Sequence, residues 1–225
     1  MKDKIITVLK NIIIFEVYYL LPVLFNYILE ITNINISNFS KVGIMIILYT
    51  FELVPALFMI IIHRKALKDD TKTFKDYFTK NIDKYFRLWL LALFLMSASN
   101  MIITFITGST ISNNEEAIRS MADVIPIYTI ITSALIAPIA EELAYRKTIG
   151  NIFSNKWLSI FMSGLIFGLA HVISTYTNII DLLYIIPYGL FGSIFMYIYL
   201  DSKSIYTTII IHTFHNSLLL LLYFL

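Results

Sequence analysis

Seven long apolar segments run through the chain, and they restrict its fold more than any other feature of the sequence. Each is close to the roughly 20 residues that an α-helix needs to cross a bilayer. Only helices and closed barrels satisfy their backbone polar groups in lipid. The sequence therefore predicts an all-α, polytopic membrane helix bundle of about seven transmembrane helices, within a range of about six to eight. The predicted spans are residues 11–30, 42–62, 87–107, 126–150, 157–176, 180–200 and 205–225.

The composition agrees with a membrane protein. Hydrophobic residues make up 58% of the 225 positions and charged residues only 14%, whereas about 25% of an ordinary soluble domain is charged. The chain has no cysteine, which excludes disulfides, zinc–thiolate sites and a cysteine nucleophile. The first apolar segment has a basic start but no short apolar region followed by a cleavage site, so we expect a retained span.

We expect one membrane domain over residues 1–225, with two parts. Residues 1–110 hold the N-terminal spans and a charged stretch at 63–86. Because that stretch also carries aromatic residues, it predicts a cytoplasmic amphipathic loop or interfacial helix. Residues 125–220 hold polar side chains inside apolar spans and form the expected catalytic core.

The lysines and arginines predict an orientation. Fifteen of the 17 fall near the N-terminus, in 64–87, in 146–156 and at Lys203, which a seven-span chain places on one side of the membrane. Lys41 and Arg119 fall on the other side. Because cytoplasmic segments carry the excess of these residues, we expect a multi-pass plasma membrane protein with a cytoplasmic N-terminus. The isoleucine-rich, cysteine-free composition fits a bacterial source.

Two adjacent glutamates and an arginine lie near the end of the fourth apolar segment. A charged side chain within a bilayer usually faces the interior of the bundle, where it has a partner and a function. Glu142 and Arg146 are four residues apart, so they share a helix face and can form an ion pair. Glu141 is turned away from that pair and has no local cation. We therefore expect Glu142 and Arg146 to support the structure while Glu141 remains available for chemistry.

Further polar residues occur in the later spans. His171 lies in the fifth, and His212 and Asn216, four residues apart on one helix face, lie in the last. At 1.5 Å per residue from the turn at 150–155, Glu141 and His171 reach levels that differ by only about 6 Å, and His212 lies about 10 Å inside the cytoplasmic surface. The sequence therefore predicts that these side chains converge at one depth.

Four other polar residues lie in or beside the apolar spans. His215 lies three residues after His212 and could compete with it for the inward direction. His63 is next to Arg64, so we interpret it as an interfacial residue. Glu16 and Glu52 lie in apolar spans, where they have a structural role or line a cavity.

The site residues also have structural interpretations. The glutamates and Arg146 could anchor a helix end at the cytoplasmic interface. His171 could form a hydrogen bond between helices, and Asn216 could do the same, as polar amides in membrane helices often do. The joint occurrence of these residues, in chain order in successive spans, favours the functional interpretation.

Three motifs resemble a known family. The segment 137–146, APIAEELAYR, resembles the EExxxR motif of the CPBP family, which comprises CAAX proteases and bacteriocin-processing enzymes and is also called the Abi family. Residues 167–171, FGLAH, resemble its FxxxH motif, and residues 212–216, HTFHN, resemble its HxxxN motif. The chain differs at Tyr145 and Lys147, where these proteins often carry phenylalanine and glycine. The resemblance covers the C-terminal half.

The resemblance implies an intramembrane endopeptidase whose active-site cavity opens towards the cytoplasm. By the same resemblance, Glu141 would activate water together with His171. His212 and Asn216 would stabilise the oxyanion that forms on the scissile carbonyl. The implied partners are membrane lipid and a peptide or protein substrate, with no nucleic acid and no cofactor. Prenylated C-terminal motifs, peptide pheromone precursors and bacteriocin leaders are all compatible substrates.

Two alternatives remain open. Glu141, His171 and His212 also make a His₂Glu set, which could hold zinc with one open coordination position, although the chain has no HExxH pair. The second alternative is a non-catalytic bacteriocin-immunity or membrane regulatory protein on the same scaffold.

Overall fold

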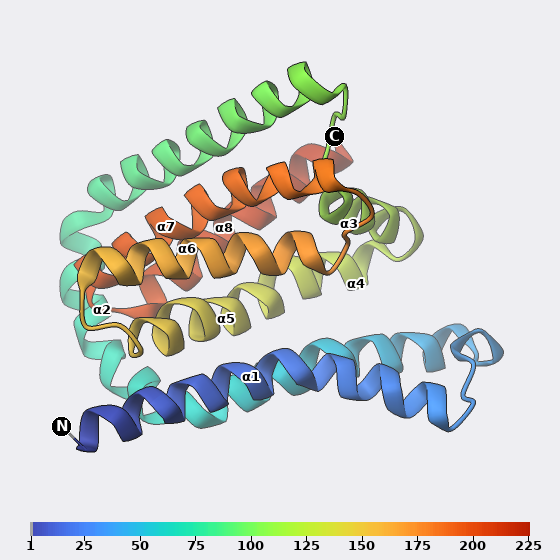
Figure 1. Ribbon diagram of the computed structural model, residues 1–225, viewed down its shortest axis with the longest axis horizontal. Coiled ribbons are helices and arrows are strands. Elements are labelled where there is room, and N and C mark those ends of the chain that lie inside the picture. Colours follow the sequence, from blue (N-terminus) through green and yellow to red (C-terminus); the bar gives the residue numbers. More distant parts are fainter. Residues whose placement is uncertain (1) are drawn as a thin grey trace.

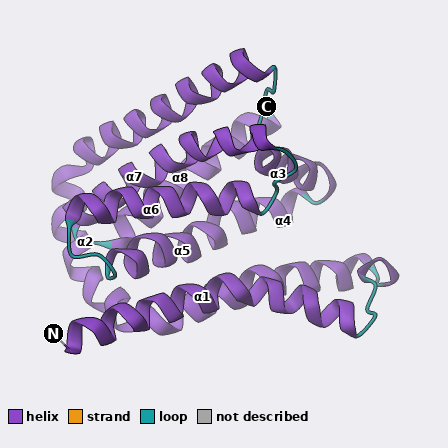
Figure 2. Ribbon diagram, in the orientation of Figure 1, coloured by secondary structure: helices purple, strands orange, loops and turns teal. Residues whose placement is uncertain are grey.

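The computed structural model describes residues 2–225, and in this part of the chain helices are joined by short loops with no strand (Figure 2). The α-helices are α1 (Lys2–Ile31), α2 (Lys41–Thr107), α3 (Asn113–Val124), α4 (Pro126–Ile131), α5 (Ala137–Glu141), α6 (Lys156–Ile173), α7 (Ile185–Ser202) and α8 (Ile205–Phe224). Short 3₁₀-helices cover Ile36–Asn38 and Ile179–Tyr184, and π-helical segments cover Thr132–Ile136 and Glu142–Thr148.

Seven helical segments of residues 2–225 are long and apolar enough to cross a membrane. The predicted all-α bundle is therefore confirmed. The first three segments extend further than expected at one end, because each helix continues from its apolar stretch into charged residues. The segments are Lys2–Ile31, Lys41–Thr71, Phe78–Thr107, Pro126–Thr148, Lys156–Ile173, Ile179–Ser202 and Ile205–Phe224.

Residues 63–86 are helical, so the loop predicted as one alternative for this stretch is not found, and the interfacial helix, the other alternative, stays a prediction. These residues belong to α2, whose backbone departs from helical geometry only at Asn81, with φ −126° and ψ 16°. No glycine or proline interrupts this stretch, which agrees with its helical backbone on both sides of the kink at Asn81. The two halves of α2 flank the other helices, the first beside α1 and the second on the far side of α7 and α8 (Figure 1).

Glycines allow α6 and α7 to pack with their backbones in close approach. A Cβ atom on Gly168 would lie 2.6 Å from the carbonyl oxygen of Ile185, so only glycine fits there. Small residues commonly allow such contact between membrane helices. The close approach places His171 of α6 against Tyr188 of α7, with ring centroids 4.8 Å apart.

The bundle has two chemically different ends. Figure 1 shows the N-terminus and the turn at 149–155 at one end, here called the lysine-rich end. The other end, here called the α3 end, carries α3 and the C-terminus. Successive spans run in opposite directions between these two ends (Figure 1), which is the arrangement that the charge pattern predicts.

One residue assigned to the membrane boundary, His63, lies inside the bundle instead, whereas Arg146 is buried with the partner that its spacing predicted. His63 is 7% exposed, and its Nε2 is 2.9 Å from Oγ1 of Thr148. It therefore links α2 to the fourth span rather than facing the interface. Arg146, counted with the cytoplasmic charges, is fully buried, because it has a carboxylate partner within its own span.

Candidate active site

The fourth span changes its helical register around the paired glutamates. A π-helical segment precedes α5, and a second one begins at Glu142. Single-turn π segments are rare and often occur at functional sites. They change the direction of the side chains that follow, so the 100° per residue of a regular helix does not describe this span.

Pro138 leaves a backbone acceptor for Asn216. The N–H of Ala137 donates to the carbonyl of Thr132, five residues earlier. In that register the next amide would donate to Ser133, but position 138 is proline and has no N–H. The Ser133 carbonyl instead accepts Nδ2 of Asn216 at 2.7 Å. This bond fixes the Asn216 side chain and leaves its second N–H available.

Glu142 and Arg146 form an ion pair inside the bundle. Arg146 Nε is 3.0 Å from Glu142 Oε2, Nη2 is 3.2 Å from Oε1, and both side chains are fully buried. Arg146 Nη1 also donates to Ser163 Oγ at 3.0 Å. The guanidinium carbon lies 4.8 Å from the centre of the Phe167 ring. These contacts join the fourth span to α6.

Glu142 also holds His212, a link that the sequence did not predict. The Nδ1 of His212 is 2.8 Å from Glu142 Oε1. An ionised carboxylate only accepts, so Nδ1 carries the proton. The other ring nitrogen, Nε2, then faces Glu141, whose Oε2 is 3.7 Å away. As an imidazolium, His212 would donate from both nitrogens, and with Arg146 it would balance the two carboxylates.

His171 has a defined tautomer as well. Its Nδ1 is 2.9 Å from the carbonyl oxygen of Phe167, one helical turn earlier. A carbonyl only accepts, so Nδ1 donates and Nε2 keeps its lone pair. The ring packs against Phe167, with centroids 4.2 Å apart. His171 is thus arranged to accept a proton from a group in the cavity.

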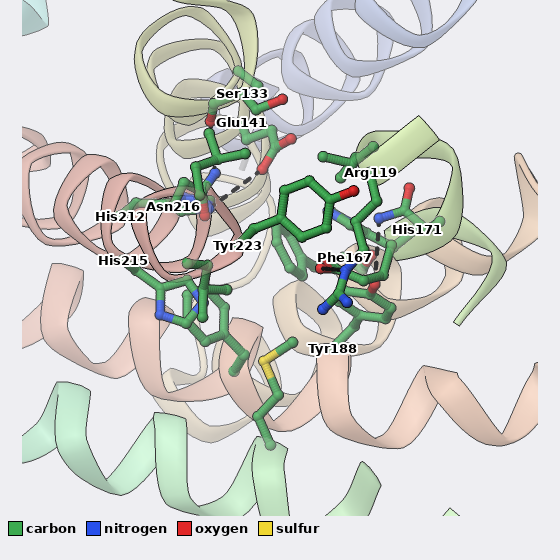
Figure 3. Close-up of a pocket in the computed structure, with 18 residues that line it drawn as sticks. Arg119, Ser133, Glu141, Phe167, His171, Tyr188, His212, His215, Asn216 and Tyr223 are labelled. Atoms are coloured by element: carbon green, nitrogen blue, oxygen red, sulfur yellow. Dashed lines mark hydrogen bonds and ion pairs between the residues drawn. The ribbon is translucent and has the colours of Figure 1, made fainter. Parts of the chain in front are cut away.

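The four predicted site residues line one cavity of about 170 Å³ (Figure 3). They are Glu141, His171, His212 and Asn216. A second cavity, of about 550 Å³, lies against α1 and the first half of α2, and Glu141 and His171 line it too. These two side chains therefore lie on the wall between the cavities. Glu52, for which the sequence offered no partner, lines the second cavity.

The first cavity reaches the α3 end, since residues of α3 line it. The charge pattern assigns the opposite, lysine-rich end to the cytoplasm. The opening of the cavity towards the cytoplasm, which the resemblance implies, and the orientation predicted from the charges both stay predictions.

His215 lies on the same cavity as His212. It is 3% exposed, and its Nδ1 accepts the indole N–H of Trp89 at 3.3 Å. That hydrogen bond connects the His215 ring to α2, so its Nδ1 is not available to the carboxylates of Glu141 and Glu142. Among the side chains that the structure describes, no group of three or more His, Cys, Asp or Glu residues is placed to hold a metal ion.

We expect the two histidines of α8 to differ in effect. His212→Ala removes the ring held by Glu142, which the resemblance implies is an oxyanion donor, and should reduce turnover by about 10²–10³-fold, the usual effect of losing one such donor. His215→Ala removes a packing ring bonded to Trp89 and should retain substantial turnover. Peptide cleavage by both purified variants, at equal concentrations of folded protein, checks this. Reversed losses would mean that His215 is the functional histidine.

The fold and the site define a polytopic membrane protein with a carboxylate–histidine site buried between its last four spans. Residues 123–218 match the family described as Type II CAAX prenyl endopeptidase Rce1-like. The chain is 30% identical over 223 residues to the membrane-embedded CAAX protease MroQ of Staphylococcus aureus strain USA300, covering 92% of this chain and 85% of MroQ. The chain belongs to the CPBP family of membrane proteases, as its three motifs indicated.

Two other relatives match over shorter regions. YdiL of Bacillus subtilis strain 168, a candidate membrane peptidase, is 28% identical over 138 residues, or 60% of this chain. The UPF0177 protein YbdI of Lactococcus lactis strain IL1403 is 32% identical over 98 residues, or 40% of this chain. These matches span about half the length of each relative, 53% and 54%. No solved structure matches the chain.

Proposed function

We propose that the protein is an intramembrane endopeptidase that hydrolyses a peptide bond in a membrane-associated peptide or protein. One observation carries the proposal: Glu141, His171, His212 and Asn216 meet at one cavity inside the membrane bundle. A carboxylate and an imidazole lone pair there can take a proton from water. Two nitrogen donors on the same cavity can bind the oxyanion that forms.

The proposed reaction proceeds in two steps. Glu141, assisted by the Nε2 of His171, removes a proton from water, and the hydroxide attacks the scissile carbonyl carbon. The carbonyl oxygen becomes an oxyanion, which accepts hydrogen bonds from the free N–H of Asn216 and from His212 Nε2, which carries a proton in the imidazolium form. Glu141 then returns the proton to the leaving amine as the C–N bond breaks. Each oxyanion donor would contribute about 2.7–4 kcal/mol, and the positioned base about 10²–10⁴-fold in rate.

The proposed setting follows from the sequence. Membrane lipid surrounds the bundle, the substrate is a peptide or protein, and no nucleic acid takes part. We place the protein in a bacterial plasma membrane with its N-terminus in the cytoplasm, because the lysine-rich end carries nearly all the basic side chains. The name of MroQ, a membrane-embedded CAAX protease, supports the endopeptidase assignment.

Cleavage by the purified, detergent-solubilised protein tests this function. A panel of prenylated C-terminal peptides, peptide pheromone precursors and bacteriocin leaders is incubated in H₂¹⁸O, and products are identified by mass. We expect cleavage at one bond, with one ¹⁸O atom in the new carboxyl group. A folded protein that cleaves none of the panel would favour the immunity or regulatory alternative.

We expect activity without a divalent metal. The chain has no HExxH pair, and Asn216 fits an oxyanion donor better than a zinc ligand. Elemental analysis of the active protein, with turnover before and after chelation, is the measurement. Stoichiometric zinc, with activity lost on stripping and restored on re-addition, would make the zinc-protease alternative correct.

A further inference from the structure

The imidazole of His171 needs more than its own hydrogen bond to keep a fixed direction. Its Nδ1 donates to the carbonyl oxygen of Phe167 at 2.9 Å, and this is the one hydrogen bond that the ring makes to the described residues. A single bond sets the tautomer, but the ring can still tilt about it, and the Nε2 lone pair tilts with the ring. Because the proposed proton transfer needs that lone pair to face the cavity, other contacts must set the plane of the ring.

The ring of Tyr188 on α7 supplies such a contact. Its centroid lies 4.8 Å from the centroid of the His171 ring, and the two planes are 28° apart, so the rings are stacked. Phe167 contacts the same imidazole, with centroids 4.2 Å apart. Figure 3 shows these three rings together on one side of the cavity, with His212 and Asn216 on the other. The plane of the His171 ring is therefore set by two aromatic neighbours, one on its own helix and one on α7.

The hydroxyl of Tyr188 is anchored at the start of α3. Its oxygen is 2.8 Å from Oγ of Ser112, the residue before α3, and it accepts a hydrogen bond from Nδ2 of Asn114 at 3.3 Å. Tyr188 is only 8% exposed, so water competes little for these bonds. Since the ring is attached to α7 at one end and bonded to the α3 segment at the other, it offers a rigid surface to the imidazole.

The packing of α6 against α7 sets the distance between the two rings. A Cβ atom on Gly164 would lie 2.5 Å from the carbonyl oxygen of Gly189, and a Cβ atom on Gly192 would lie 3.0 Å from the Cβ of Phe167. The two backbones are thus already as close as these glycines allow. Tyr188 directly precedes Gly189, so its position relative to α6 is determined by backbone packing.

We propose that Tyr188 is a positioning residue, whose ring holds the imidazole of His171 in the plane that directs Nε2 into the cavity. This rests on the proposed endopeptidase function. Tyr188 belongs to none of the three sequence motifs, and it acts through His171, because its own hydroxyl is occupied by Ser112 and Asn114. Holding a reacting group in its productive orientation contributes directly to the rate, and a misplacement of about 1 Å can cost about 10²-fold.

Three variants test this role. Tyr188→Leu removes the ring, and Tyr188→Phe keeps the ring but removes the hydroxyl. Tyr184→Phe is the matched control, since Tyr184 is 3% exposed and its hydroxyl is 3.1 Å from Oγ of Ser109, in the same loop before α3. Of these two tyrosines, only Tyr188 lines the site cavity. The control therefore loses the same kind of hydrogen bond at a distance from His171.

The expected effects fall on kcat. Tyr188→Leu should lower kcat by about 10²-fold, and Tyr188→Phe should lower it by about fivefold, the equivalent of one hydrogen bond. KM should change little in both, because Tyr188 orients a reacting group and does not bind the substrate. Tyr184→Phe should keep both constants close to normal. The measurement uses a fluorogenic copy of the peptide cleaved in the panel, at equal concentrations of folded protein.

A measurement on His171 itself does not depend on cleavage. The ring protons of protein labelled with ¹³C-histidine are observed by NMR in detergent, and the His171 signal is assigned by its loss in His171→Gln. A stacked aromatic ring shifts such protons upfield. We therefore expect Tyr188→Leu to move the His171 signal downfield, whereas Tyr188→Phe and Tyr184→Phe should leave it near its native position.

The outcomes separate the positioning role from the proposed function. An unchanged kcat or an unchanged His171 signal in Tyr188→Leu would overturn the positioning role, and so would a loss confined to KM or an equal loss of kcat in Tyr184→Phe. If Tyr188→Leu failed to fold, an unchanged kcat in Tyr188→Phe would overturn it instead. An unmodified protein that cleaves no peptide would contradict the proposed function, while the NMR signal would still show whether Tyr188 holds the ring of His171.

Discussion

Glu141→Gln is expected to give a protein that folds normally, binds substrate and cleaves almost nothing. The glutamine has the shape of the glutamate but cannot accept a proton from water. Loss of a positioned base should lower the rate by about 10²–10⁴-fold. Stability should change little, because the carboxylate has only one ion-pair contact, at 3.7 Å to His212, and is 18% exposed to the cavity. Peptide cleavage and melting temperature in detergent, measured side by side, check both parts.

Glu16→Gln is the matched control for this variant. Glu16 is also a glutamate within a membrane span, but it lines a different cavity, near α6. We expect that variant to cleave peptide at close to the normal rate. An active Glu141→Gln protein would remove Glu141 from the mechanism. A Glu141→Gln protein with a strongly lowered melting temperature would show that the carboxylate has a structural role.

Hydropathy and short-range spacing were sufficient to predict the architecture and one contact of the site. The spans follow from runs of apolar residues, which are properties of single segments. The Glu142–Arg146 pair was predicted from a spacing of four residues within one helix. In the structure, Arg146 Nε lies 3.0 Å from Glu142 Oε2. Both inferences depend only on local geometry, which the sequence specifies directly.

Contacts between spans depend on how each helix is rotated about its axis, which local spacing does not give. The bond from Glu142 to His212 joins residues 70 positions apart. The bond from Asn216 to the Ser133 carbonyl requires a π-helical register that no apolar pattern marks. Pro138 was the only available signal, because a proline within a helix frees a carbonyl for another donor.

The ends of helices were also difficult to predict where charged residues continue a helix. The charged residues at 63–86 form helix on both sides of a kink at Asn81, and no glycine or proline lies among them. The position of His63 was predicted wrongly, because its basic neighbour Arg64 indicated an interface. In the structure its ring forms a hydrogen bond with Thr148 inside the bundle. Charge along the sequence indicates the side of the membrane more reliably than it indicates the burial of a particular side chain.

The largest loss of stability is expected from breaking the Glu142–Arg146 pair. Both side chains are 0% exposed, and removing one partner of a buried ion pair costs about 3–5 kcal/mol, because an uncompensated charge remains. Arg146→Ala should therefore lower the melting temperature and the yield. Glu142→Gln should do the same and also lower turnover, since Glu142 holds the Nδ1 of His212 at 2.8 Å.

A double variant separates the structural role of Glu142 from its role in positioning His212. Glu142→Gln combined with Arg146→Met removes both charges and keeps similar volumes, and such replacements of buried pairs are often neutral or stabilising. We expect the double variant to recover most of the melting temperature lost in Arg146→Ala. Its turnover should stay low, because a neutral glutamine holds the Nδ1–H of His212 with a weaker hydrogen bond than a carboxylate does. If turnover returned together with stability, Glu142 would act on folding alone, and His212 would be positioned by the packing around it.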